Sequence, residues 1–163
     1  MKKLAIIGIV AVLALALAGC GSSSTSKKSQ ASPESTQEQV YYSVNLVGAE
    51  ILDNGQGGLT FIVACEYTNN TSTPVSFMQA VPTAAAQDGV SVGTSGYSDA
   101  YLGSDGVTPD YMLKVEPGAT ATVHVPFTVT SYNDVLVRCT LGFVDGNYPD
   151  PTKILAEETF SFS

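Results

Sequence analysis

The sequence predicts an all-β protein, an antiparallel two-sheet sandwich of seven to eight strands. Several short runs alternate apolar and polar residues, which is the period of a strand with one buried face. Turn-forming Asp, Asn, Gly and Pro residues separate these runs at regular intervals. No stretch shows a convincing helical period.

The N-terminus predicts export and a lipid anchor. Residues 1–19 join a basic start to an apolar run from Leu4 to Ala18, as in a secretory signal peptide, and this run is short for a membrane span. The run ends in Leu-Ala-Gly-Cys at residues 17–20, which resembles a bacterial lipobox. We therefore expect cleavage before Cys20 and a diacylglycerol on that cysteine. The alternative is a plain signal peptide in which Cys20 has no role.

Residues 20–39 are expected to form the lipidated cysteine and a disordered Ser-rich tether, and residues 40–163 the folded domain. The tether contains no aliphatic side chain larger than Ala, so it cannot bury enough apolar surface to fold. A multiply acylated terminus anchors stably in a bilayer. We therefore expect the protein at the extracytoplasmic face of the bacterial cell membrane, held there through Cys20.

The charge balance argues against one class of partner. The chain has 15 acidic and 7 basic residues, and without Lys2 and Lys3 five basic residues remain against the same fifteen acids. Binding to nucleic acid needs clustered Lys and Arg that neutralise phosphates. We therefore expect no nucleic-acid partner.

Two strands are predicted in the first part of the domain. Residues 40–52 alternate in polarity but change phase at Gly48, which predicts a bulge or bend there. Residues 59–68 are predicted to form the central strand of the sandwich. The side chains expected on its core face are those of Phe61, Val63, Cys65 and Tyr67.

The middle of the domain is predicted to hold a strand, a hairpin and a long loop. Residues 75–81 are predicted as a strand, and Gln87-Asp88-Gly89 as the turn of a hairpin that returns at residues 90–92. Residues 93–110 are rich in Gly, Ser and Asp and form the longest irregular stretch. Long loops of this kind often carry function.

The last part of the domain is predicted to contain four strands, at residues 111–115, 119–130, 135–144 and 154–162. The second of them has the clearest alternation, and Pro126 in it has no N–H to donate. That strand is therefore expected near the edge of a sheet, or with the nitrogen of Pro126 pointing away from a neighbouring strand. In the last strand Ile154 is expected to face inward, and Glu158 interrupts the apolar face, which predicts a bulge or a solvent-exposed rim there.

A set of short motifs along the domain resembles the pattern of a known family. It consists of Tyr-Thr-Asn-Asn at residues 67–70, Ser76-Phe77, Gln-Asp-Gly at residues 87–89 and Pro117-Gly118 before a long strand. This pattern is similar to that of uncharacterised Gram-positive surface lipoproteins with an immunoglobulin-like domain. The resemblance covers roughly residues 44–143. It implies an immunoglobulin-like sandwich at the cell surface, and it implies no particular activity.

Cys65 and Cys139 lie on the predicted inward faces of two separate strands. Lipidation of Cys20 would leave them as a pair in an oxidising compartment, which predicts a disulfide between the sheets. The alternative is two buried thiols that act as small hydrophobic side chains.

The irregular stretch is also the candidate ligand loop. Its candidate residues are Asp99, Tyr101, Asp105 and Asp110. Oxygen-rich loops at the end of a sandwich can hold calcium, and tyrosine rings can stack on sugars. The spacing of the acids does not match the twelve-residue calcium loop, so a solvated acidic loop is the alternative.

The sequence contains no recognisable catalytic set. His124 is the only histidine, and the alternation of its strand places it on the outward face, where we expect it to meet solvent. Met78 and Met112 are too few and too far apart in the sequence to predict a copper site. We therefore expect no enzyme activity, no cofactor and no resident metal.

The predicted function is a non-enzymatic binding or interaction module for an unidentified envelope or extracellular protein. The first alternative is a calcium- or sugar-binding lipoprotein that uses residues 93–110. The second is an envelope enzyme, which the missing nucleophile, base and metal motifs disfavour.

Overall fold

The computed structural model describes residues 39–162 apart from residues 56 and 96–100. The predicted signal peptide, Cys20, nearly all of the predicted tether, and Asp99 lie outside the described residues. Within the described part of the chain, no helix is both long enough and apolar enough to cross a membrane.

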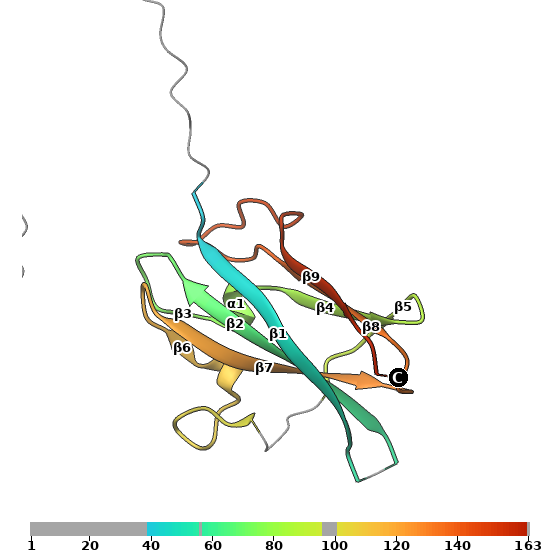
Figure 1. Ribbon diagram of the computed structural model, residues 1–163. Helices are drawn as coiled ribbons and strands as arrows, with labels where there is room; N and C mark the ends of the chain where they lie inside the picture. Colours follow the sequence, from blue (N-terminus) through green and yellow to red (C-terminus); the bar gives the residue numbers. More distant parts are fainter. Residues whose placement is uncertain (1–38, 56, 96–100, 163) are drawn as a thin grey trace, which may run out of the picture. The chain divides into compact units, whose positions relative to one another are not determined.

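The described residues form three antiparallel sheets (Figure 1). The strand orders are β1-β2-β7, β3-β6 and β5-β4-β8-β9. The strands are β1 (Tyr42–Asp53), β2 (Leu59–Asn69), β3 (Val75–Ser76), β4 (Thr83–Gln87), β5 (Val90–Val92), β6 (Lys114–Val115), β7 (Thr120–Val129), β8 (Val135–Thr140) and β9 (Ile154–Phe160). Two short helices are α1 (Phe77–Ala80) and the 3-10 helix η2 (Asp110–Met112). The predicted all-β antiparallel sandwich is confirmed.

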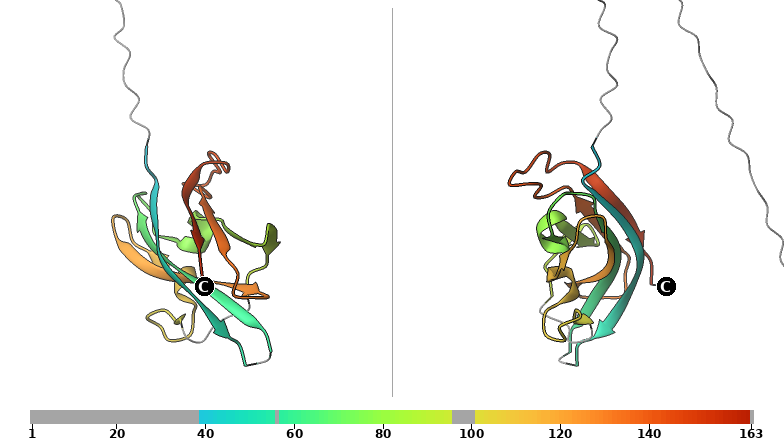
Figure 2. Two further views of the ribbon diagram at one scale, coloured as in Figure 1. Left: turned by 45° about the vertical axis from the view of Figure 1, so that its right-hand side comes forward. Right: turned by 90° about the vertical axis from the view of Figure 1, so that its left-hand side faces the viewer.

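The two larger sheets share one hydrophobic core. Figure 2 shows the ribbons of these sheets from two further sides. The four side chains predicted on the core face of β2 are each 0% exposed, and so are Val135, Val137 and Cys139 of β8. β2 is the central strand of its sheet, as predicted. Burying one large aliphatic or aromatic side chain contributes roughly 1.5–3 kcal/mol, so this face of β2 is a main source of stability.

Two irregularities of the three-stranded sheet agree with the sequence. The pairing of β1 with β2 shifts register between Leu46 and Gly48, at the predicted bulge. Pro126 lies in β7, which is an edge strand as predicted. The carbonyl of Pro126 accepts the N–H of Ser95 at 3.0 Å, on the side away from β2. The N and C=O of one residue point the same way in an antiparallel strand, so the missing donor of Pro126 also lies on the outer edge.

Asn69 shows why the Tyr-Thr-Asn-Asn pattern matters to the fold. Its side chain is fully buried and donates to the carbonyls of Thr73 at 2.8 Å and Val115 at 2.9 Å. Its Oδ1 accepts the N–H of Thr71 at 3.0 Å. One amide thus satisfies two backbone groups of the turn after β2 and one carbonyl of β6, and so links that turn to β6.

The Gln87-Asp88-Gly89 pattern also has a structural role. Asp88 and Gly89 both have positive φ, 52° and 77°, as a two-residue hairpin of type I′ requires. The buried side chain of Gln87 accepts the N–H of Thr130 and donates to the carbonyl of Asn133, each at 3.1 Å. The hairpin of one sheet therefore holds the connection that arrives from the other sheet.

The prediction of a strand over residues 75–81 is wrong beyond Ser76. The chain enters α1 at Phe77, and the N–H of Val81 bonds to the carbonyl of Phe77 at 2.8 Å. A single helical turn places Phe77 and Ala80 on the same side, and both are buried. A segment this short satisfies a strand period and a helical period equally well, so the pattern could not distinguish them.

Three later predictions also need correction. Residues 111–115 contain the end of η2 and only two strand residues, and β8 stops at Thr140. Ile154 was expected to face inward but is 50% exposed. The pairing of β8 with β9 shifts register between Cys139 and Thr140, and β9 is an edge strand with Glu158 exposed. An extra residue in an edge strand changes which side chains face the core.

Candidate functional site

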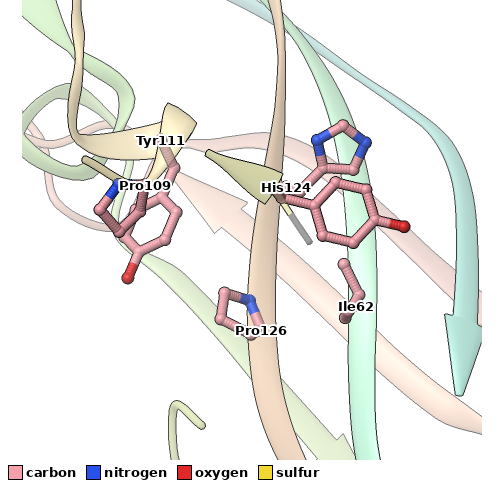
Figure 3. A pocket seen from close by; sticks show the side chains of 6 residues that line it. Ile62, Pro109, Tyr111, His124 and Pro126 are labelled. Atoms are coloured by element: carbon pink, nitrogen blue, oxygen red, sulfur yellow. The ribbon is translucent and has the colours of Figure 1, made fainter. Parts of the chain in front are cut away.

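Residues 101–113, here called the cover segment, lie over the outward face of the sheet β1-β2-β7. Ile62 points to that face, away from the core, and is nevertheless only 2% exposed. It lines a small pocket of about 200 Å³ with Tyr101, Pro109, Tyr111, His124 and Pro126 (Figure 3). The cover segment therefore buries a sheet face, whereas the sequence suggested a loop at the end of the sandwich.

Asp110 attaches the cover segment to the outer edge of β7. Its Oδ2 lies 2.6 Å from Nδ1 of His124, and its Oδ1 accepts the backbone N–H of the same residue at 2.9 Å. Because a carboxylate only accepts hydrogen bonds, Nδ1 is the protonated ring nitrogen. The contact also occupies a backbone donor at a sheet edge, and such donors are otherwise open to pairing with another chain.

Tyr101 connects His124 to β1. Its ring stacks on the imidazole with a centroid distance of 4.0 Å and an angle of 20° between the planes. Its hydroxyl donates to the carboxylate of Glu50 on β1. The hydrogen bond to Glu50, together with burial and the nearby carboxylates, raises the pKa of Tyr101. The cover segment is thus fixed at β7 by Asp110 and at β1 by Tyr101.

Asp105 has a local role within the cover segment. Its Oδ1 accepts the backbone N–H groups of Val107 at 3.0 Å and Thr108 at 2.9 Å. These hydrogen bonds lower the pKa of the exposed Asp105 carboxyl. This is the usual way in which an aspartate stabilises a turn.

The structure brings together only some of the predicted loop residues. Tyr101 and Asp110 meet at His124, Asp105 stays in its own turn, and Asp99 lies outside the described residues. Among the residues that the structure describes, no three His, Cys, Asp or Glu side chains converge as a metal site would require. The carboxylates of Asp105 and Asp110 already accept hydrogen bonds from within the chain.

The sequence interpretation missed the role of His124. It lies on the outward face as predicted, but its side chain is only 24% exposed because Tyr101 covers it. Its partner Asp110 is fourteen residues away and follows no periodic spacing. One signal was available: Ile62 is a large apolar residue on the outward face of a strand, which indicates that something covers that face.

An open groove of about 590 Å³ adjoins the cover segment, between α1 and η2. Phe77, Met78, Tyr111 and Met112 contribute to its wall, and Tyr111 also lines the small pocket. Met78 is 52% exposed and Met112 is 39% exposed. The fold thus places at one groove two methionines that are far apart in the sequence.

Cys65 and Cys139 are both free thiols in this structure and both are fully buried. The predicted disulfide between them is therefore not formed here. The two side chains belong to the same hydrophobic core, Cys65 on β2 and Cys139 on β8. The structure thus has the two buried thiols of the alternative interpretation.

The fold and the covered sheet face define an all-β sandwich domain that carries an added surface segment. A family model described as "Domain of unknown function (DUF5067)" matches residues 18–140, which is more than half of the chain. The chain belongs to this family. The expectation of an uncharacterised family is therefore confirmed, and its immunoglobulin-like topology stays a prediction.

The chain is similar to a solved structure, the 2.62 Å crystal structure of ycdA, described as a proposed lipoprotein of Bacillus subtilis subsp. subtilis strain 168. The sequence identity is 14% and the TM-score is 0.49. The match covers 75% of this chain, and this chain spans only 37% of the length of that protein. No curated protein matches the sequence.

Proposed function

We propose that this protein is a lipid-anchored extracytoplasmic binding module that has no catalytic activity. The observation that carries the proposal is the Leu-Ala-Gly-Cys sequence at residues 17–20, which directly follows a basic start and an apolar run of signal-peptide length. Acylation of Cys20 would hold the domain at the membrane while leaving its surface free for a partner.

The groove between α1 and η2 is the proposed binding surface. Exposed methionines are adaptable contact residues, because their unbranched side chains fill irregular surfaces. The groove also carries the polar side chains of Thr83, Thr94 and Ser95. Apolar walls with a few polar groups are typical of binding sites. An envelope or extracellular protein is the proposed partner.

A non-enzymatic role agrees with the surroundings of His124. In the described part of the chain, its ring hydrogen-bonds to Asp110, and its face is covered by Tyr101. Both contacts anchor the cover segment to the sheet. The calcium-binding alternative has little support, because Asp105 and Asp110 already have partners within the chain.

Lipidation can be tested by expressing the full chain in a Gram-positive bacterium. We expect the protein in the membrane fraction, with an N-terminal peptide that begins at Cys20 and carries acyl chains. The Cys20→Ala variant should lack that acylated peptide. A wild-type protein that is processed and released without lipid would contradict the anchor and favour the plain signal peptide.

The binding surface can be tested by crosslinking in intact cells. A photoreactive residue at position 112 should give a crosslinked product with an envelope or extracellular protein. The matched control is position 90, because Val90 is 67% exposed and lies on β5, away from the groove lining. Equal crosslinking at both positions, or none at position 112, would contradict the assignment of the groove.

A further inference from the structure

We propose that one end of the sandwich rests on the surface of the lipid bilayer through an apolar patch formed by Val40, Tyr148 and Ile154. The partner of this patch is the headgroup region of phospholipids. The contact depends on the lipid anchor proposed above, and it adds which end of the domain faces the membrane.

The patch lies where the chain enters the domain. Val40 directly precedes β1, and it lines an open groove of about 660 Å³ together with Ile154, the first residue of β9. The connection from β8 to β9, residues 141–153, therefore lies at the same end of the sandwich as the start of β1. Figures 1 and 2 show this connection beside the first residues of β1. This end is called the entry end below.

The connection from β7 to β8, residues 130–134, lies at the opposite end, called the far end. Val129 at the end of β7 pairs with Leu59 at the start of β2, and Leu59 also pairs with Asp53 at the end of β1. The 12 residues of β1 connect the two ends and extend over about 40 Å. A flexible chain with the length of the predicted tether has a typical span of about 25 Å. Such a tether favours the entry end at the bilayer and the far end away from it.

The apolar side chains of the patch are exposed, although the fold holds them in place. Val40 is 57% exposed and Tyr148 is 69% exposed, and the bulge in the pairing of β8 with β9 leaves Ile154 exposed as well. The ring of Tyr148 packs edge-on against Phe143 with a centroid distance of 5.5 Å. The carbonyl of Phe143 accepts the hydroxyl of Tyr42 on β1 at 2.6 Å. Single exposed apolar residues are common, but several at one end of a fold indicate a contact surface.

The composition of the β8–β9 connection suits the interface between water and lipid. Tyrosine is enriched at this interface, because its ring is apolar and its hydroxyl is polar. Pro149 and Pro151 have no backbone N–H, so the connection has fewer donors that would lose water there. The carboxylate of Asp150 is exposed and has to stay in water. The contact is therefore limited to the headgroup region and does not reach the hydrocarbon core.

The two ends also differ in charge. In the described part of the chain, the connections at the far end and the adjoining strand residues have three acids and no lysine or arginine, whereas those at the entry end have three acids and two lysines. The residues are Asp53, Asp88 and Asp134 at the far end, and Glu116, Asp145, Asp150, Lys114 and Lys153 at the entry end. A membrane that contains anionic phospholipids therefore repels the far end more strongly.

The test uses the mature lipidated protein in vesicles of phosphatidylcholine and phosphatidylglycerol that carry bromine on the acyl chains near the headgroups. The chain has no tryptophan, so Tyr148→Trp introduces a single indole. Tyr132→Trp is the matched control, because Tyr132 is 56% exposed and lies at the far end. In Tyr148→Trp, the emission should shift to shorter wavelength and bromine should quench most of the fluorescence. Tyr132→Trp should show neither change.

A second substitution tests whether the apolar side chains hold the contact. Ile154→Ser, added to Tyr148→Trp, should reduce the quenching by bromine. Val90→Ser is the control, because Val90 is also an exposed apolar residue but follows the hairpin turn at the far end. Neither substitution changes a buried side chain, so both proteins should fold.

Flotation of the vesicles separates the failure of the contact from the failure of the anchor. Protein that does not float contradicts the anchor, and the contact with it. Floating protein in which Tyr148→Trp is quenched no more than Tyr132→Trp overturns the contact and leaves the anchor in place. An emission shift without quenching by bromine would show that protein covers the patch, such as a second copy of this chain, and would also overturn the contact with lipid.

Discussion

The two faces of β2 are buried for different reasons. The inward face, with Phe61 among its side chains, is covered by the opposite sheet, which the alternation of several strands predicts. The outward face is covered at Ile62 by the cover segment, which follows much later in the chain and has no regular period. The first kind of burial is a property of the strands themselves, and the second depends on individual contacts such as Asp110 with His124.

The largest expected effect compares adjacent residues on the two faces. Phe61→Ala should lower the free energy of unfolding by about 3–5 kcal/mol, because it empties a fully buried site. Ile62→Ala should cost about 2 kcal/mol, the lower end for such a change, because the cover segment can move into the space. Urea denaturation measures both variants.

The outcome for Ile62 decides whether the cover segment is firmly attached. A loss below about 0.5 kcal/mol would be that of an ordinary surface position. Such a result would contradict the packing of the cover segment on Ile62. The conclusion about the core face of β2 would not change. A loss equal to that of Phe61→Ala would show that the two faces are equally rigid.

The second prediction concerns the turn that follows β2. Asn69→Ala should cost about 2–3 kcal/mol, because it leaves the buried carbonyl of Val115 and the buried N–H of Thr71 without their partner and removes one of two donors to the carbonyl of Thr73. Asn70→Ala is the control, because the exposed side chain of Asn70 donates only to Ser43 at 3.2 Å and should change stability by less than about 0.5 kcal/mol. Equal losses in thermal or urea unfolding would contradict the structural role of Asn69.

Phe61 and the turn residues belong to the part of the fold that could be predicted from the sequence. The strands with a polar and an apolar face were predictable. Their two-residue alternation of polarity indicates both the extended conformation and the side chains that are buried. The hairpin at Asp88-Gly89 was predictable as well, because few residues accept positive φ at two successive positions. These features depend on neighbouring residues alone.

The candidate site was only partly predictable. Tyr101 and Asp110 were recognised as candidate ligand residues, but their partners were not. Glu50 is 51 residues away from Tyr101, and His124 follows Asp110 by fourteen residues with no periodic spacing. α1 was missed because one helical turn gives too few residues for a period to be seen. The contacts of the cover segment join residues from different elements, and a single sequence does not report such contacts.

The third prediction compares a tyrosine of the core with one of the cover segment. Burial and the nearby Asp145 raise the pKa of Tyr42 to about 12 from an ordinary value of 10.0. The folded protein keeps Tyr42 protonated up to a higher pH than the unfolded chain does. Tyr42 therefore contributes its full stabilisation below pH 10, and this contribution is lost as the pH rises through about 12. Tyr42→Phe should therefore make stability less dependent on pH in this range, as measured by urea unfolding at several alkaline pH values.

Tyr101→Phe is the matched comparison, because a hydrogen bond to Glu50 is the main cause of its raised pKa. Its main effect should fall on the cover segment and should appear as faster local hydrogen exchange there, with a smaller change in the alkaline unfolding profile than that of Tyr42→Phe. If Tyr101→Phe changed the alkaline unfolding profile and Tyr42→Phe did not, the assignment of the two environments would be reversed.

The fourth prediction concerns the edge of β7. Asp110→Asn keeps an oxygen acceptor but loses the charge, so the free energy of unfolding should fall by about 1 kcal/mol. The amide of His124 should exchange faster with solvent, because its acceptor is weaker. Asp105→Asn is the control, because Asp105 contacts only its own turn. It should leave exchange at His124 unchanged, and equal effects of the two variants would contradict a specific attachment at β7.

The smallest expected effect is that of calcium on the cover segment. Millimolar calcium should not raise the temperature of thermal unfolding, because Asp110 and Asp105 already accept hydrogen bonds from His124 and from the turn at Val107 and Thr108. Binding would require these carboxylates to exchange internal partners for the ion, and calcium takes six to eight oxygen ligands. Magnesium is the control for general ionic effects. A rise with calcium and not with magnesium would show that the loop binds the ion, and Asp99→Asn would then test whether that residue completes the site.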